Sequence, residues 1–201
     1  MQSQFWRPLA AIASVLVWSA ASAQGSSVSP SSGADGNITT GAMASSGAST
    51  GKTRLAHGDS KFIENAAQGG HAEIEARKLA QQKSQNADVK AFAAKMIEDH
   101  GKVGSELDAM ASRKGVTPPK EPSTMQKSEM KALSALSGAK FDKMYASRIG
   151  VAAHESTVKM FREASTNAKD PDVKAFAAKH LPELESHLQM ARDLKKKVGD
   201  E

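Results

Sequence analysis

The sequence predicts an all-α protein in which two copies of a helical hairpin form a four-helix bundle. The octapeptide DVKAFAAK occurs at residues 88–95 and again at residues 172–179, and such an identity is very unlikely to arise by chance in a chain of 201 residues. The composition is also typical of helices, because Ala, Lys, Glu, Met and Leu are frequent and only 4% of the residues are aromatic. Two hairpins that each have one apolar face are expected to pack against each other.

The N-terminal segment has the pattern of an export signal. Arg7 supplies a positive charge, residues 9–18 form an apolar stretch too short to span a bilayer, and Ala-Ser-Ala at residues 21–23 forms a cleavage site. We therefore predict a signal peptide over residues 1–23, with an N-terminal anchor helix as the alternative. No later segment is apolar enough to cross a membrane, so we expect an exported protein that is periplasmic or associated with the outer membrane of a Gram-negative bacterium.

Residues 24–57 are rich in Ser and Gly and predict a disordered leader, because they bury too little apolar surface to offset the entropy of ordering them. The remaining domain, residues 58–198, contains no cysteine and must be stabilised by its hydrophobic core. The net charge of the chain is +5, and its one basic run, residues 195–197, falls at the end of the last predicted helix. This mild charge and the single Tyr argue against nucleic acid as a partner.

The first two long helices follow from capping and breaking residues. The first is expected from its N-cap, Asp59, to about residue 84. The Gly69-Gly70 pair in its middle predicts either a bend in the helix or the close approach of another backbone, and we favour the close approach. The second helix begins after the cap Asn86 and ends at Gly115.

The second half of the chain repeats this arrangement after a stiff crossover rich in proline at residues 117–122. A capping box of Ser123 and Gln126 begins a short extra helix, which continues through residue 136. The third long helix is expected over about residues 140–168. The fourth begins at the cap Asp170, with proline at its first position, and runs to about residue 197.

Apolar residues of the second and fourth helices recur at alternating spacings of three and four, which marks the seam that faces the bundle interior. The seam of the second helix consists of Val89, Phe92, Met96, His100, Val103, Leu107 and Met110. The seam of the fourth consists of Val173, Phe176, His180, Leu184, His187, Ala191 and Leu194. Three histidines therefore stand at interior positions, where an imidazole without a partner costs about 1–3 kcal/mol.

Carboxylates that could serve these histidines are expected on all four long helices. An offset of about 82 residues aligns Glu73 with Glu155, and an offset of 84 aligns Asp99 with Glu183. Glu183 lies one helical turn before His187, so the two share a face. The candidate metal ligands are Glu73, Asp99, His100, His154, Glu155, Glu183 and His187.

Several motifs are shared with a known group of proteins. They are AAQGGHAEIE at residues 66–75, VKAFAAKMIEDH at residues 89–100, LPELESHL at residues 181–188, and Phe141 with Tyr145 and His154. Through them the sequence, from about residue 59 to residue 197, resembles an exported bacterial ferritin-like family that is catalogued as a domain of unknown function. Its members are often labelled outer-membrane or exported proteins. The resemblance implies a ferritin-like four-helix bundle and brings no agreed activity.

A di-iron centre of the ferritin type needs a Glu on each of two helices and a Glu-x-x-His motif on each of the other two. The sequence lacks this motif, because Ile97 stands three residues before His100 and Leu184 stands three residues before His187. A single cluster of acids and histidines could still bind Fe, Zn or Mn. The alternative is a polar network in the core that holds the histidines without a metal.

Two main hypotheses of function follow. The protein is either a non-enzymatic exported bundle that binds a partner or acts in envelope stress, or a metal-binding or metal-dependent redox protein that uses the cluster. A third hypothesis places an envelope partner on the short helix, residues 123–136, through Met125, Met130 and Leu133. The sequence contains no phosphate-binding loop and no strand–turn–helix setting for a nucleophile, so it indicates no catalytic residue.

Overall fold

The computed structural model describes residues 55–199, and every regular element in that range is a helix, which confirms the predicted all-α class. The predicted signal peptide (1–23) and nearly all of the predicted leader (24–57) lie outside the described residues. The elements are α1 (His57–Lys83), α2 (Ala87–Arg113), α3 (Thr124–Ser134), α4 (Gly138–Met144), the π-helix η1 (Tyr145–Ala152), α5 (Ala153–Asn167) and α6 (Pro171–Gly199).

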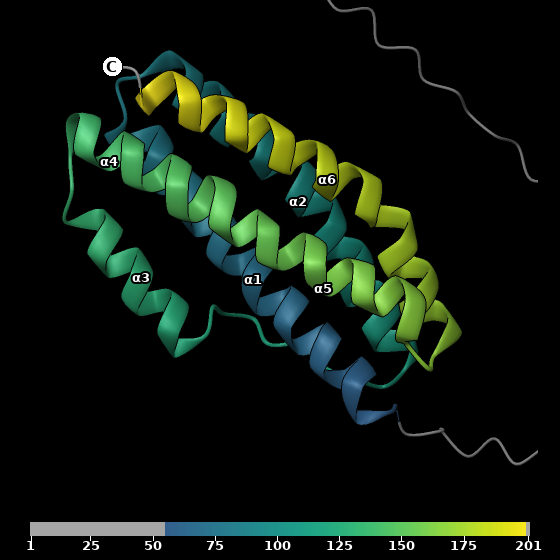
Figure 1. Ribbon diagram of the computed structural model, residues 1–201. Coiled ribbons are helices and arrows are strands. Elements are labelled where there is room, and N and C mark those ends of the chain that lie inside the picture. The colour runs from purple at the N-terminus through teal and green to yellow at the C-terminus, as the bar shows by residue number, and fades with distance from the viewer. Residues whose placement is uncertain (1–54, 200–201) are drawn as a thin grey trace, which may run out of the picture. The chain divides into compact units, whose positions relative to one another are not determined.

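The long helices pair as two hairpins (Figure 1). α1 packs along α2, and the continuous rod of α4, η1 and α5 packs along α6. The hairpins meet through contacts of α2 with α6 and of α1 with η1 and α5. The predicted crossover helix is present as α3, which contacts α1.

Three of the four predicted caps are confirmed. The side chain of Asn86 accepts a hydrogen bond from Val89 N, Ser123 forms the capping box, and Asp170 Oδ1 accepts from Val173 N. The prediction for Asp59 was wrong, because α1 begins two residues earlier at His57 without a side-chain cap. The buried Asp59 carboxylate instead accepts the backbone N–H groups of residues 169 and 170, at 2.7–3.1 Å, and so joins α1 to the turn between α5 and α6.

The third predicted helix exists, but its middle is not α-helical. In η1 the backbone bonds reach five residues back, as from the N–H of Ala153 to the carbonyl of Arg148. Gly150 of η1 is buried against α6, where a Cβ atom would lie 3.4 Å from the Cβ of Ala191. Because a π-turn contains more residues than an α-turn, the side chains that follow η1 face a different direction from the one an α-helix would give.

The core consists of two apolar clusters at the two ends of the bundle. The first contains Phe62, Phe161 and Phe176, whose ring centroids lie 5.0–6.3 Å apart. The second contains Phe141 and Tyr145, with stacked rings. Each of the four long helices contributes a buried polar side chain near the boundary of the two clusters, namely Glu73 on α1, His100 on α2, His154 on α5 and His187 on α6, with Arg77 and Asp99 buried beside them. A polar layer therefore separates the two apolar clusters.

The glycine pair of α1 does not bring another backbone close, contrary to the prediction. No neighbouring atom lies within 4 Å of the position that a Cβ would take at Gly69 or Gly70. The same is true of Gly101 and Gly104 on α2. The glycines therefore leave open space beside the helices instead of a packed contact.

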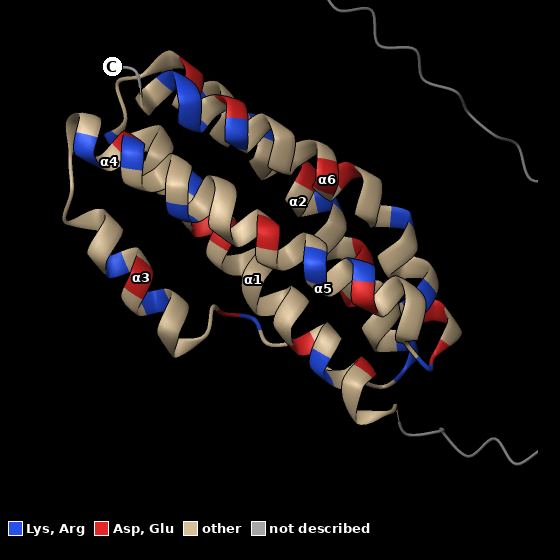
Figure 2. Ribbon diagram, in the orientation of Figure 1, with Lys and Arg blue, Asp and Glu red and all other residues tan. Residues whose placement is uncertain are grey.

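The surface shows how much of the predicted partner-binding helix is exposed and how charge is distributed over the helices. Of the three apolar residues predicted to be offered by the short helix, only Met125 is largely exposed (72%), since Leu133 is part of the core and Met130 packs against it. Basic and acidic residues are interspersed along the helices (Figure 2). No helix within residues 55–199 combines the length and the apolar character needed to cross a membrane.

Candidate metal centre

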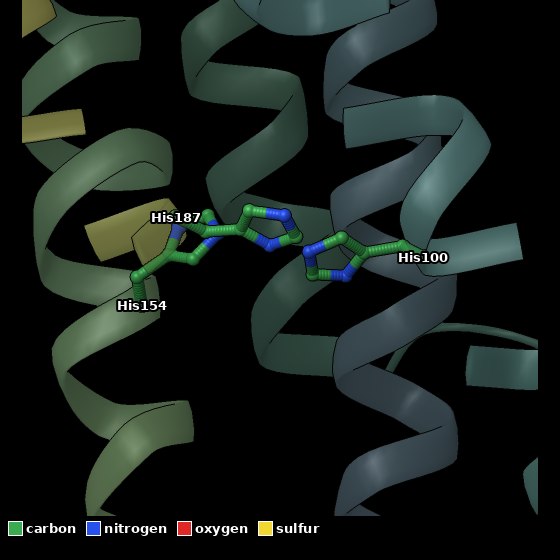
Figure 3. A group of neighbouring side chains, drawn as sticks. All are labelled: His100, His154 and His187. Atoms are coloured by element: carbon green, nitrogen blue, oxygen red, sulfur yellow. The ribbon is translucent and has the colours of Figure 1, made fainter. Parts of the chain in front are cut away.

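Three imidazole rings from three different helices meet in the polar layer (Figure 3). His100 lies on α2, His154 on α5 and His187 on α6, and each ring is at most 6% exposed. The ring centroids are 5.4–5.9 Å apart, and one nitrogen of each ring lies within 4.8 Å of one nitrogen of each of the others. Such convergence of neutral nitrogen donors is the arrangement expected for a transition-metal ligand set.

Each ring is held in place through one of its two nitrogens. Nδ1 of His100 lies 2.7 Å from Oε2 of Glu73, Nδ1 of His154 lies 2.7 Å from the carbonyl oxygen of Gly150, and Nε2 of His187 lies 3.0 Å from Oδ2 of Asp99. A carbonyl oxygen or an ionised carboxylate can only accept a hydrogen bond, so each of these nitrogens carries the proton. The remaining nitrogen of each neutral ring therefore carries a lone pair.

Those remaining nitrogens are largely free of protein donors. Nε2 of His154 and Nδ1 of His187 have no hydrogen-bond partner among the described residues, although both are buried. Nε2 of His100 is 3.3 Å from Nη2 of Arg77. Two buried acceptors without partners are unusual in a folded core and call for a ligand, a water or an ion.

Arg77 is the residue of this site that the sequence reading missed. Its side chain is fully buried, donates to Glu73 Oε2 at 2.8 Å and has two nitrogens, Nε and Nη1, without partners among the described residues. The hydroxyl of the buried Tyr145 is also without a partner there. The spacing of Glu73 and Arg77, four residues apart on a helix face that also buries Ala76 and Ala80, is the signal that could have found this ion pair.

The electrostatics of the site favour the unprotonated forms of His154 and His187. Burial opposes ionisation of Glu73, but its interactions with His100 and with the Arg77 guanidinium outweigh burial and hold the pKa of the carboxyl well below its ordinary value. Burial lowers the pKa of His154 despite the opposing charge of Glu73. Burial, together with His100 and His154, lowers the pKa of His187 to about 4. His154 and His187 are therefore neutral at pH 7, with lone pairs available to a ligand.

The predicted candidates divide into three groups. Glu73, Asp99, His100, His154 and His187 come together in the polar layer. Glu183 is exposed, yet its carboxylate lies within 4.8 Å of the ligand atoms of Asp99 and His187 and so adjoins the outer side of the layer. Glu155 does not join the site, because it is exposed and pairs with Arg192 at 3.0 Å.

The physical reason for the position of Glu155 is the direction of its helix. At the level of Glu73, α5 presents His154 to the interior, and Glu155, the next residue, is turned by about 100° to the surface. His180, the third histidine of the predicted seams, is also separate from the site: it is buried beside Phe176, and its Nε2 lies 3.0 Å from Oε2 of Glu106.

A small cavity adjoins the site. Its volume is about 80 Å³, and it lies between the middle of α1 and α2, with residues of α5 and α6 at its inner side. Glu73 and His100 form part of its wall, and so do Gly69, Gly70 and Gly104. A larger hollow of about 460 Å³, beside α3, also reaches Glu73. Both hollows therefore reach the polar layer, and the smaller one is lined by glycines of α1 and α2.

Comparisons with known proteins support the fold and the family. The model of a family described as "Domain of unknown function (DUF4142)" matches residues 44–194. No curated protein matches the chain. Among solved structures, the chain is similar to a DUF305 fragment from Deinococcus radiodurans, with a TM-score of 0.62, 17% identity and coverage of 73% of this chain and 99% of that one.

Two further solved structures are similar. A "putative secreted protein DUF305" from Streptomyces coelicolor has a TM-score of 0.59 and 17% identity, with 71% of this chain and 94% of that chain covered. A conserved hypothetical protein from Mycobacterium tuberculosis has a TM-score of 0.54 and 20% identity, with 69% and 91% covered. At these identities the similarity supports the helical fold alone.

Proposed function

The chain belongs to the family described as "Domain of unknown function (DUF4142)", and we propose that it is an exported, ferritin-like four-helix bundle that binds a transition-metal cation. The ligands are Nε2 of His100, Nε2 of His154 and Nδ1 of His187. The observation that carries this proposal is the set of outer hydrogen bonds, which assign the tautomers so that the inner nitrogens of His154 and His187 have no partner and that of His100 faces only Nη2 of Arg77.

The surroundings of the rings support a metal role over a plain polar network. Metal-binding histidines commonly donate their other N–H to a carboxylate or a backbone carbonyl, which orients the ring and raises its basicity. All three rings have such an acceptor, supplied by Glu73, Gly150 and Asp99. A polar network made of protein groups alone would leave Nε2 of His154 and Nδ1 of His187 buried and unsatisfied.

The donor set favours zinc among the metals expected from the sequence. Three neutral imidazoles suit Zn²⁺ and Fe²⁺, whereas Mn²⁺ prefers carboxylate and water oxygens. Zn–N bonds of about 2.0–2.1 Å require three ligand nitrogens that converge, and one nitrogen of each ring lies within 4.8 Å of one nitrogen of each of the others. When bound, the cation would act as a Lewis acid with three protein ligands.

The local charge limits the affinity. Glu73 and Asp99 contribute two negative charges beside the rings, while Arg77 contributes one positive charge 3.3 Å from His100 Nε2. Lys95 pairs with Asp99 at 2.7 Å from the exposed side. We therefore expect a cation site of moderate affinity, in which the guanidinium must leave the lone pair of His100 before a metal can bind there.

We further propose that residues 1–23 are a cleaved signal peptide, that residues 24–57 form a leader, and that residues 58–198 act in the periplasm or at the outer membrane. The N-terminal sequence pattern supports this, as does the description of the Streptomyces coelicolor neighbour as a secreted protein. Mass spectrometry of the protein recovered from fractionated cells tests it, since cleavage after Ala23 leaves Gln24 as the first residue.

The metal proposal is tested with the chain that starts at Gln24. After exposure to Zn²⁺ and dialysis, elemental analysis is expected to give about one Zn per chain, and His154→Ala and His187→Ala are expected to lose it. His57→Ala changes an exposed histidine outside the site and serves as the matched control. Zinc that is absent from the wild type, or retained by both site variants while circular dichroism shows them folded, overturns the proposal.

A further inference from the structure

We propose that the cation at the three histidines keeps one coordination position for a small exogenous anion, which arrives through the cavity between α1 and α2. This inference deepens the proposed function and depends on it. Three protein ligands leave a tetrahedral cation with a fourth position that a solvent molecule or a substrate can take, whereas purely structural zinc sites usually have four protein ligands. Among the described residues, no Cys, Asp, Glu or fourth His joins the three histidines as a group of converging ligand atoms.

The cavity reaches one of the three proposed ligands, His100, while His154 and His187 do not line it. Its volume of about 80 Å³ exceeds the space that one water molecule requires, and it is too small for a nucleotide or a sugar. Its wall includes His100, which we propose as a ligand, and Glu73, which orients His100. A molecule in the cavity therefore contacts the first metal ligand without unfolding any helix.

Glycines keep the cavity open. Gly69 and Gly70 on α1 face Gly104 on α2 across it, and no neighbouring atom lies within 4 Å of a Cβ built at any of the three. A glycine inside a helix costs about 1 kcal/mol relative to alanine, and no close packing compensates for that cost at these positions. We therefore infer that these glycines keep space open for a small molecule and do not stabilise the fold.

The charge beside the site selects an anion. Arg77 is fully buried, lies 3.3 Å from His100 Nε2 and has two nitrogens without partners among the described residues. A buried guanidinium with free N–H groups stabilises a small anion by charge-assisted hydrogen bonds. The carboxylates of Glu73 and Asp108 line the cavity, so the anion depends on the cation and on Arg77, which lies beside the cavity and not in its wall, to offset their negative charge.

The test uses the chain from Gln24 loaded with Co²⁺, whose visible spectrum reports its coordination. Azide, a linear triatomic anion, is expected to produce a saturable spectral change. Imidazole, a larger neutral ring, is expected to produce none at the same concentrations. Gly104→Leu and Gly70→Leu fill the cavity and are expected to weaken azide binding about tenfold or more, while Co²⁺ stoichiometry stays unchanged.

Gly101→Leu is the matched control, because Gly101 is also a mid-helix glycine of α2 with open space beside it but does not line the cavity. It is expected to change azide affinity less than about twofold. Stoichiometric Co²⁺ without a response to azide overturns this inference and leaves the metal site intact. Unchanged azide affinity in both cavity variants overturns the proposal that the anion enters through the cavity between α1 and α2. Failure of the wild type to bind Co²⁺ or Zn²⁺ overturns the proposed function itself.

Discussion

His187 Nε2 lies 3.0 Å from Asp99 Oδ2, across the contact between α6 and α2. This hydrogen bond determines which nitrogen of His187 carries the proton, and therefore whether a lone pair faces His100 and His154. The repeat places Asp99 and Glu183 at equivalent positions, yet only Asp99 is buried and bonded to the ring. The two copies of the hairpin have thus taken different roles at one level of the bundle.

Asp99→Asn is expected to reduce zinc affinity by about 10–100-fold, the usual effect of losing the outer partner of a metal-bound histidine. The amide can donate to Nε2 of His187, which moves the proton to Nδ1 and removes the inward lone pair. Isothermal titration calorimetry measures the change. Glu98→Gln, which alters the exposed neighbour that pairs with Lys102, is the control, and equal effects of the two substitutions would contradict the assigned role of Asp99.

Glu73→Gln and Glu155→Gln separate the two acids that the sequence repeat treats as equivalent. Glu73 accepts from His100 and Arg77 inside the bundle, so we expect its neutralisation to lower both the unfolding temperature and the zinc affinity. Glu155 forms an exposed pair with Arg192, and such pairs contribute about 0–1 kcal/mol. Thermal unfolding and zinc titration of both variants measure these effects. A larger loss of unfolding temperature and zinc affinity in Glu155→Gln than in Glu73→Gln would contradict the proposed site.

Acidification is expected to destabilise the metal-free protein between pH 6.5 and about 4. In the unfolded state His187 has an ordinary pKa and binds a proton as the pH falls below it. In the folded state its pKa is lowered to about 4, so it stays unprotonated over this range. The stability is therefore complete above pH 6.5, and about 3 kcal/mol is lost as the pH falls through this window. His100 and His154 face the ring from α2 and α5, and Asp99 accepts from it.

Chemical denaturation at several pH values measures this slope. His187→Gln removes the titrating group and is expected to flatten the curve, and His57→Gln, at an exposed position, is expected to leave it unchanged. A wild-type stability that is constant from pH 7 to pH 4.5 would be inconsistent with a buried, neutral ring.

Arg77→Met is expected to have opposite effects on stability and on metal binding. Removing the guanidinium leaves Glu73 with one partner fewer in a buried site, so the unfolding temperature of the metal-free protein should fall. Zinc affinity should rise about tenfold, because a positive charge no longer opposes the cation and the lone pair of His100 is released. Competition with a chelator measures the affinity, and a weaker affinity would mean that Arg77 organises the ligands.

The sequence allowed the helices, three caps and the buried positions of His100, His180 and His187 to be predicted, because these depend on local chemistry and periodicity. The sequence could not predict which side chains of α5 point into the bundle, because the preceding π-helix η1 rotates them. The composition of η1 carries no signal for π-helical bonds. The exclusion of Glu155 follows from that rotation. Burial of Arg77 is not expected from the sequence, because long charged side chains are rarely fully buried.

The polar layer also fixes how the helices align along their axes. If α6 slid by one helical turn past α2, Leu184 or Ala191 would take the place of His187 opposite Asp99. The carboxylate would then be buried against hydrocarbon, and breaking a buried polar pair in this way costs about 3–5 kcal/mol. Apolar seams tolerate such slippage, whereas this layer does not, so the same residues that could bind a cation give the bundle one unique register before any cation arrives.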